Sequence, residues 1–295
     1  MIFETIISRT PILKGWSSDQ KYCAVTADGI KYLLRISAAD CLDRKMGEFQ
    51  RMQRVAELGI PMVLPLEIGC CDEGTYTIQS WIDGDDAQTL IPIYSEQKQY
   101  AFGLDAGRIL KKIQTIATPE GTPAWEPRFQ AKIDRKIAMY KSCPLKYEGG
   151  EAFLEYMAIN RHLLRGRPHT YQHGDYHIGN MMLDRKGTLV IIDFDKDDFG
   201  DPWEDFNRIV WSAQVAPAFA SGVVDGYFDA EVPIAFWKLL ALYICSNTLG
   251  SLPWAIPFGD GEIKIMCAQA AQVLEWYDNM KNVVPKWYCK PKREE

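Results

Sequence analysis

The pattern of apolar and polar positions in the first eighty residues predicts an antiparallel sheet. Two β-branched, apolar runs lie on either side of Ala27-Asp28-Gly29, a polar turn of the kind that joins the strands of a hairpin. A second pair of such runs is joined at Asp72-Glu73-Gly74. The predicted strands cover residues 21–26, 30–37, 66–71 and 75–82.

One helix is predicted between these two pairs of strands. Apolar residues recur there every three or four positions, which is the period of an amphipathic helix. Gly59-Ile60-Pro61 ends the pattern, as glycine followed by proline commonly ends a helix. The apolar face of this helix is expected to hold Leu42, Met46, Phe49, Met52 and Ala56.

The pattern changes at Asp83-Gly84-Asp85-Asp86, a polar, turn-prone segment that suits a joint between two lobes. We therefore expect an N-terminal lobe over residues 1–82 and a C-terminal lobe over residues 83–295. The second lobe is predicted to be mainly helical, apart from a short hairpin over residues 181–193. Its predicted helices cover residues 96–116, 127–141, 151–164, 203–214, 233–248 and 261–282.

This order of elements predicts an α+β, bilobal fold, with a small antiparallel N-terminal lobe containing one helix and a larger, mainly helical C-terminal lobe. The protein-kinase-like fold has the same order. On that basis the N-terminal lobe is expected to bind the nucleotide, and the C-terminal lobe to carry catalysis and bind the acceptor.

Composition adds limits to this picture. The chain has 295 residues, 47% of them hydrophobic, and a net charge of −6, which argues against a nucleic-acid partner. The most apolar stretch, Val232–Cys245, contains Lys238 and is too short to cross a bilayer, so we expect a core helix and no membrane partner. The eight cysteines contain no CxxC pair, which argues against a zinc site, and their distribution does not suggest a disulfide framework, so we expect reduced thiols in the cytoplasm.

The chemistry lies in His173-Gly174-Asp175 and in two later residues, Asn180 and Asp193. Phosphoryl transfer needs a carboxylate to orient the acceptor hydroxyl and take its proton, and Asp175 suits that role. It also needs oxygen ligands that hold Mg²⁺ on the nucleotide phosphates, and Asn180 with Asp193 can supply them. An Asp and an Asn five positions apart, then a hairpin, then an Asp is the spacing of a kinase catalytic loop and metal loop.

The motif HGDxxxxN, read from His173 to Asn180, resembles that of the aminoglycoside phosphotransferase family. Residues 200–205 also resemble the segment that follows the metal loop in that family. The resemblance implies a protein-kinase-like fold and an enzyme that phosphorylates hydroxyls of antibiotics or of small metabolites such as choline. It also implies Mg²⁺ and ATP, or GTP, as cofactors.

The N-terminal lobe offers a cation for the phosphates. Arg35, in the second predicted strand, occupies the position where most relatives carry lysine, and Glu48 on the predicted helix is its expected partner. The alternative is an arginine at a strand end and a glutamate on a solvated helix face.

Two further segments are expected to touch the nucleotide. Ser17 and Ser18 lie in the loop that would cover the phosphates, although an ordinary hairpin turn explains that loop equally well. The backbone of residues 79–82, including Gln79, Trp81 and Ile82, is expected to border the adenine. A plain strand end is the alternative there.

The acceptor is the least determined part. Asp197, Asp198, Asp201 and Glu204 could bind a polycationic acceptor such as an aminoglycoside antibiotic, which would confer antibiotic resistance. Alternatively these acids have structural roles, such as favouring the start of a helix. The basic segment 286–293 counts against an aminoglycoside. The other hypotheses are a metabolic kinase for choline, ethanolamine, a sugar or a homoserine-like acceptor, and a catalytically weak, kinase-like nucleotide-binding protein.

Overall fold

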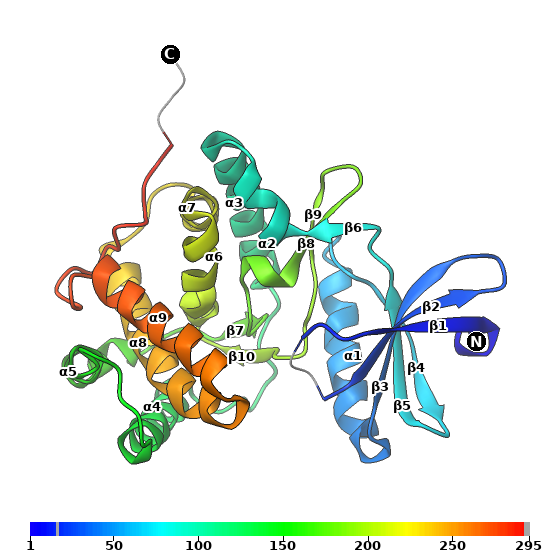
Figure 1. The fold of residues 1–295 in the computed structure, drawn as a ribbon, viewed down its shortest axis with the longest axis horizontal. Helices are drawn as coiled ribbons and strands as arrows, with labels where there is room; N and C mark the ends of the chain where they lie inside the picture. The colour runs from blue at the N-terminus through cyan, green and yellow to red at the C-terminus, as the bar shows by residue number, and fades with distance from the viewer. Residues whose placement is uncertain (16–17, 292–295) are drawn as a thin grey trace. The chain divides into compact units, whose positions relative to one another are not determined.

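The computed structural model describes residues 1–15 and 18–291, and the chain forms two compact units (Figure 1). The N-terminal unit comprises Met1–Ala87 together with Asn180–Asp197. The C-terminal unit comprises Gln88–Gly179 and Asp198–Glu295. The hairpin that carries Asn180 and Asp193 is therefore part of the N-terminal unit, although it comes late in the sequence.

The N-terminal unit is built on a five-stranded antiparallel sheet in the order β1-β2-β3-β5-β4. Its small core consists of side chains that alternate along the inner strands: Ala24, Leu34, Ile36, Tyr76 and Ile78. The strands are β1 (Ile6–Ile12), β2 (Gln20–Thr26), β3 (Lys31–Ser37), β4 (Pro65–Cys71) and β5 (Gly74–Ser80). The hairpin predicted at Ala27–Gly29 joins β2 to β3.

Strand β1 was not predicted, because most of its side chains are exposed and it shows no apolar alternation. It is an edge strand that pairs only with β2 in the sheet order. Pro11 is tolerated there because an edge strand needs hydrogen bonds on one side only.

Helix α1 (Leu42–Ala56) follows a short 3-10 turn, η2 (Ala39–Cys41), and packs against β4 and β5. The expected apolar face was partly wrong. Met46 is exposed, whereas Lys45 is buried along with Met52 and Val55. A polar residue therefore occupies one of the inward positions of this helix.

The late hairpin, β8 (Met181–Asp184) with β9 (Leu189–Ile191), joins β6 (Gly84–Asp86) in a three-stranded sheet. It is also bound to the segment that follows α1. The Val63 N–H donates to the Ile191 carbonyl, and the Ile191 N–H donates to the Pro61 carbonyl, both at 3.0 Å. These backbone bonds explain why the hairpin belongs to the N-terminal unit.

The C-terminal unit packs around α8, a helix buried along almost its whole length (Figure 1). Helices α4, α5 and α9 all contact α8. The larger helices are α3 (Glu96–Ile113), α4 (Trp125–Ser142), α5 (Glu151–Asn160), α6 (Ile209–Val215), α7 (Pro217–Phe228), α8 (Ile234–Ala255) and α9 (Asp260–Trp276). Shorter elements are η1 (Phe3–Thr5) in the N-terminal unit and α2 (Ala87–Leu90), η3 (Ile91–Ile93), η4 (Arg161–Leu164), β7 (Thr170–Gln172), η5 (Ile178–Asn180), β10 (Asp198–Gly200), η6 (Pro202–Arg208) and η7 (Ile256–Phe258).

Helix α8 was expected to be a core helix, and it is one, but it is longer than predicted. It continues beyond Gly250 and Pro253, because Leu249, Leu252 and Ala255 remain fully buried and hold the last turns in place. Together with η7 it is long and apolar enough to cross a membrane by composition, yet 67% of its most apolar window is buried inside the protein. That burial is what a core helix requires.

Helix α7 was not predicted, since its sequence is rich in small residues and has no polar face. It packs tightly against α3. An added Cβ would lie 2.1 Å from the Phe219 carbonyl oxygen at Gly103, and 2.1 Å from the Val223 carbonyl oxygen at Gly107. The close approach of the two helices therefore requires glycine at these positions.

Candidate active site

Asn180 and Asp193 lie at the same end of the β8–β9 hairpin. Met181 is paired with Ile191, and the Ile192 N–H donates to the Asn180 carbonyl at 3.1 Å, so the two residues leave neighbouring strands side by side. Asp193 has a left-handed backbone with φ of 64°. A non-glycine residue in that region carries strain of the kind that often occurs at functional sites.

These two residues suit a magnesium ion. They offer one amide oxygen and one carboxylate, and the Asp193 side chain is 44% exposed. Among the described residues there is no cluster of three or more histidine, cysteine, aspartate or glutamate side chains that could enclose a metal. Mg²⁺ needs no such enclosure, because it usually keeps several waters and takes one or two protein ligands plus phosphate oxygens.

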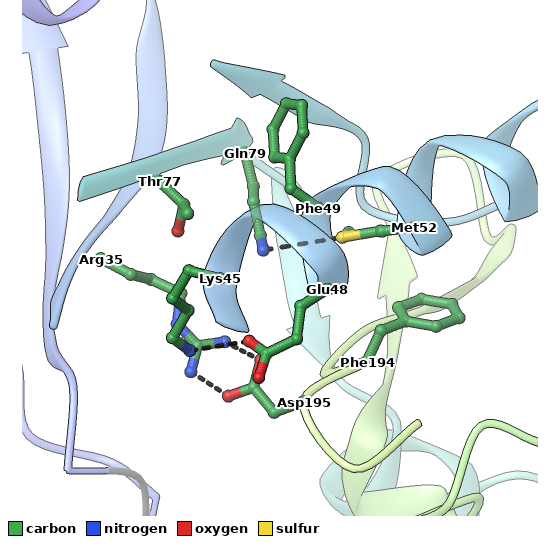
Figure 2. A pocket seen from close by; sticks show the side chains of 9 residues that line it. All are labelled: Arg35, Lys45, Glu48, Phe49, Met52, Thr77, Gln79, Phe194 and Asp195. Atoms are coloured by element: carbon green, nitrogen blue, oxygen red, sulfur yellow. Dashed lines mark hydrogen bonds and ion pairs between the residues drawn. The ribbon is translucent and has the colours of Figure 1, made fainter. Parts of the chain in front are cut away.

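A pocket in the N-terminal unit holds Arg35 from β3 and two residues of α1, Lys45 and Glu48 (Figure 2). Arg35 is almost fully buried, at 5% exposure. It lies 2.9 Å from Asp19 Oδ2 and also donates to both oxygens of Asp195, with Nη1 at 2.8 Å from Oδ1. The complete lining is Arg35, Lys45, Glu48, Phe49, Met52, Thr77, Gln79, Phe194 and Asp195.

The ion pairs differ from the expected pairing of Arg35 with Glu48. Glu48 Oε2 lies 3.0 Å from Lys45 Nζ, and Glu48 Oε1 lies 2.9 Å from Arg44. Lys45 Nζ also lies 2.9 Å from Asp19 Oδ2. Lys45 thus links the glutamate of the helix to Asp19, the same carboxylate that binds Arg35.

Asp19 organises this cluster. Its Oδ1 accepts a 2.7 Å hydrogen bond from Ser37, while its Oδ2 faces both cations. Burial alone would raise the pKa of Asp19, but bonds from Lys45 and Ser37 and the charge of Arg35 hold it below its ordinary value. Asp19 therefore stays ionised in the fold.

Both cations stay charged for the same reason. Burial by itself would lower the pKa of Arg35, but the carboxylates of Asp195 and Asp19 raise it above its ordinary value. Burial would also lower the pKa of Lys45, and the charge of Asp195 with the bond to Asp19 raises it.

Sequence reasoning missed both Lys45 and Asp19. A signal for Lys45 existed, since position 45 is in phase with Leu42, Phe49 and Met52 on the helix. Asp19 had no such signal, because its partners lie 16 and 26 positions along the chain.

The other residues expected to contact the nucleotide take part in fewer interactions within the protein. Gln79 lines the pocket, and its amide approaches Met52 Sδ at 3.7 Å. Trp81 and Ile82 follow β5 and are partly buried. Ser18 is exposed beside Asp19, while Ser17 lies outside the described residues. Their contacts with a nucleotide stay predictions.

In the C-terminal unit, Asp205 holds the loop that carries Asp175. Its carboxylate accepts from the His173 N–H at 3.0 Å, from the Gly174 N–H at 2.7 Å and from Gln114 at 2.9 Å. Burial raises the pKa of Asp205 to about 7. The loop is further closed by the Asp175 N–H, which donates to His173 Nδ1 at 3.3 Å.

The Asp175 carboxylate faces Arg208, whose Nε lies 3.2 Å from its Oδ1. His177 Nε2 is 3.6 Å from the same oxygen, but burial lowers the pKa of His177 to about 4, so the ring is neutral near pH 7. The positive partner of Asp175 in this unit is therefore an arginine.

The four acids expected to bind a cationic acceptor all have cationic partners within the protein. In the N-terminal unit, Asp197 pairs with Arg51, whose Nη2 donates to its Oδ1 at 3.0 Å. In the C-terminal unit, Asp198 lies 3.2 Å from Arg128 and Glu204 lies 2.9 Å from Lys132.

Asp201 is fully buried and is the most firmly held of the four. It binds Arg167 through both oxygens, at 2.6 and 2.9 Å, and accepts from the Tyr243 hydroxyl at 2.6 Å. Its side chain also accepts from the Trp203 N–H at 3.0 Å, at the start of η6. These contacts agree with the alternative expectation, that the acids of this segment have structural roles.

Known proteins resemble this chain in sequence and in fold. The model of the phosphotransferase enzyme family, APH, matches residues 8–237. No curated protein sequence matches the chain.

Three solved structures illustrate the likeness of fold. A thermostable mutant of aminoglycoside phosphotransferase APH(4)-Ia, in complex with ADP and hygromycin B, is 16% identical with a TM-score of 0.65, over 92% of this chain and 94% of its own. A choline/ethanolamine kinase family protein from Mesorhizobium loti is 17% identical with a TM-score of 0.65, over 94% and 91%. An amicoumacin kinase in complex with AMP-PNP, Ca²⁺ and Ami is 13% identical with a TM-score of 0.65, over 96% and 93%. These likenesses confirm the predicted α+β, protein-kinase-like fold.

Proposed function

Because this chain belongs to the phosphotransferase enzyme family, we propose that it transfers the γ-phosphoryl group of a magnesium–nucleotide to a hydroxyl of a small molecule. The observation that carries the proposal is the hairpin end, where Asn180 and Asp193 lie side by side. Asn180 follows Asp175 by five positions in the sequence. This is the residue set that phosphoryl transfer requires.

Each residue of the set has a role in the proposal. Asp175 orients the acceptor hydroxyl and accepts its proton as the new bond to phosphorus forms. Asn180 and Asp193 hold Mg²⁺ through their side-chain oxygens. When bound, that ion neutralises charge on the phosphates and fixes their position.

The nucleotide is assigned to the N-terminal unit. Arg35 and Lys45 supply two buried positive charges for the phosphates, and Glu48 keeps the Lys45 amine in place. The backbone of residues 79–82 borders the base, and Ser18 lies in the loop nearest the phosphates, with Ser17 beside it in sequence. The nucleotide is ATP or GTP, and the enzyme acts in the cytoplasm.

Two classes of acceptor remain in the proposal, and the ion pairs bear on the choice between them. An aminoglycoside would need free carboxylates for its amines. Asp198, Asp201 and Glu204 are already paired with Arg128, Arg167 and Lys132. This favours a metabolic acceptor over an antibiotic, and it makes antibiotic resistance the second candidate. Solved proteins of similar fold bind hygromycin B or belong to a choline/ethanolamine kinase family, so both classes stay in the test.

The experiment measures phosphoryl transfer from ATP and from GTP to a panel of aminoglycosides, choline, ethanolamine and homoserine, with water as the background acceptor. In Asp175→Asn, turnover should fall by about 10²–10⁴-fold, the usual contribution of a general base. Nucleotide affinity should change little in this variant.

Asp184→Asn is the matched control, because Asp184 is a partly buried acid at the end of β8 whose carboxylate accepts hydrogen bonds from the turn of the β8–β9 hairpin. It should keep wild-type turnover. Undiminished transfer or hydrolysis in Asp175→Asn would reject the role of Asp175. If the wild-type protein binds nucleotide but shows no Asp175-dependent turnover, the catalytically weak alternative is correct.

A further inference from the structure

One face of α4 carries a stripe of three basic residues, Arg128, Lys132 and Lys136, at intervals of four. Residues at this spacing lie above one another on a helix. Arg128 pairs with Asp198 and also donates to the Phe199 carbonyl, and Lys132 pairs with Glu204. The first two residues of the stripe therefore neutralise Asp198, at the start of β10, and Glu204, within η6.

Lys136 is the third member of the stripe, and no acid is left for it. None of the described residues forms a hydrogen bond or ion pair with its amine. Its aliphatic part lies on α8, where an added Cβ at Gly250 would be 3.0 Å from Lys136 Cε. The residue is partly buried, and its amine is not among the fully buried, unpaired side-chain atoms of the described residues, so it keeps contact with solvent.

The surroundings of Lys136 are positively charged. Burial and the charges of Lys132 and Arg208 together lower the pKa of Lys136 to about 7, although the charge of Glu204 acts in the opposite direction. Glu204 is already bound to Lys132 at 2.9 Å. A cation in such surroundings is stabilised when an anion arrives from outside.

Arg208 connects this basic region to the candidate catalytic residue. Its Nε lies 3.2 Å from Asp175 Oδ1, and its side chain is 35% exposed. Arg208 lies in η6 together with Glu204, and Glu204 is bound to Lys132, one helical turn before Lys136 on α4. The charge of Arg208 also acts on Lys136. A ligand that reaches Asp175 therefore meets Arg208, with Lys136 in the same basic region.

We propose that the acceptor carries an anionic group, a carboxylate or a phosphate, which binds Lys136 and Arg208 while its hydroxyl lies at Asp175. The proposal rests on the function proposed above and narrows its substrate class. Where the sequence suggested an acidic site for the amines of the acceptor, this proposal has a basic site for an anionic group. Its physical basis is that an anionic ligand would supply the negative charge that no described residue places in an ion pair with Lys136.

The test uses the full-length protein and four probes that share a three-carbon hydroxylated skeleton. These are glycerol, glycerate, glycerol 3-phosphate and 3-amino-1,2-propanediol, which are neutral, carboxylate, phosphate and ammonium in character. Binding is read by protection of the Lys136 amine from acylation, measured on its peptide by mass spectrometry. This readout needs no turnover.

We expect saturable protection by glycerate or by glycerol 3-phosphate, and none by the neutral and ammonium probes. The anion that protects Lys136 at the lower concentration shows whether the site prefers a carboxylate or a phosphate. In titration calorimetry, Lys136→Met should bind the better of the two anions about ten-fold more weakly, or more weakly still, than the wild type does. Lys136→Arg should restore binding, because it returns the charge.

Lys141→Met is the control, since Lys141 is an exposed lysine near the end of the same helix. It should bind the anions as the wild type does. Equal protection by all four probes, no protection by either anion, or unchanged anion affinity in Lys136→Met would overturn the proposal. Nucleotide hydrolysis that depends on Asp175 is measured in parallel, so a failure of the anion site can be told from a failure of the proposed function.

Discussion

Two groups of cations, one buried in the N-terminal unit and one partly buried in the C-terminal unit, differ in whether the chain supplies their counter-charges. In the N-terminal unit, Arg35 and Lys45 are bound to Asp19, and Lys45 also to Glu48. In the C-terminal unit, Lys132 is bound to Glu204, but no carboxylate among the described residues forms an ion pair with Lys136. The pKa of Lys45 is raised, whereas that of Lys136 is lowered to about 7.

The comparison shows that burial alone does not decide the charge of a lysine. Burial lowers the pKa in both cases, and the nearby carboxylates reverse that effect only for Lys45. A satisfied cluster can stabilise the fold before any ligand binds. An unsatisfied cation costs stability until a ligand completes it, and that cost is common at functional sites.

The largest expected effect comes from breaking the satisfied cluster. Asp19→Asn removes the charge that Arg35 and Lys45 share while keeping the shape of the side chain. The free energy of unfolding should fall by about 3–5 kcal/mol, as when one partner of a buried ion pair is removed. Urea unfolding at pH 7 measures this change.

Glu73→Gln provides the comparison for this variant. It also removes a carboxylate from an ion pair with an arginine, Arg9, but both side chains are well exposed. Solvent screens such pairs, so little change is expected. If Asp19→Asn were as stable as Glu73→Gln, the ion pairs of Asp19 with Arg35 and Lys45 would not stabilise the fold.

The next largest effect is expected in the free energy of unfolding of Lys136→Met, which should differ from that of the wild type in a pH-dependent way. The folded pKa of Lys136 is about 7, and the unfolded value is about 10.4. Between these values the unfolded chain binds more protons, so the stability contributed by this residue rises with pH. The variant should be more stable than the wild type at pH 7, and the difference should shrink toward pH 10.

Urea unfolding of both proteins at pH 7, 8 and 9 checks this prediction. The charged groups that act on Lys136 are Lys132, Glu204, Arg208 and Arg135, and they are present in both proteins. Lys141→Met, at an exposed position of α4, should show no such pH-dependent difference. A difference that stays constant with pH would mean that Lys136 keeps an ordinary pKa.

The smallest expected effect comes from Gly250→Ala. The new methyl group would lie 3.0 Å from Lys136 Cε and 3.1 Å from Cδ, so the flexible lysine must move. Moving the amine toward water should weaken the pH dependence that Lys136 causes. Alanine also gains about 1 kcal/mol of helix propensity over glycine, which partly offsets the crowding.

Gly261→Ala separates these two effects. Gly261 lies in α9, and nothing within 4 Å would meet its Cβ. It should gain propensity with no change in pH dependence. Identical pH profiles for the wild type and Gly250→Ala would show that Lys136 is not held by α8.

Much of the fold could be predicted because its signals are local. The turn at Ala27–Gly29 and the break at Gly59–Pro61 both follow from residues close in sequence. The candidate set of Asp175, Asn180 and Asp193 is also found from a local motif, and its catalytic role stays a prediction. Strand β1 and helix α7 could not be predicted, since an exposed edge and a helix buried on all sides lack the usual periodicity.

The charge pairing could not be predicted for a different reason. The acidic segment suggested a site for amines because its acids were counted without their partners. Those partners, Arg128 for Asp198 and Lys132 for Glu204, come from a helix 70 and 72 positions earlier in the chain. Only the folded chain shows which acids are already paired and that Lys136 is not.

The glycine contacts between α3 and α7 also limit how the C-terminal unit can move. At Gly103 and Gly107 the backbone of α3 rests directly on that of α7, and Gly222 and Gly226 of α7 meet α3 in the same way. Because no side chains separate the two backbones at these glycines, the helices cannot slide past each other without a clash of their carbonyl groups. Any movement within the C-terminal unit is therefore expected to carry α3 and α7 together as one body.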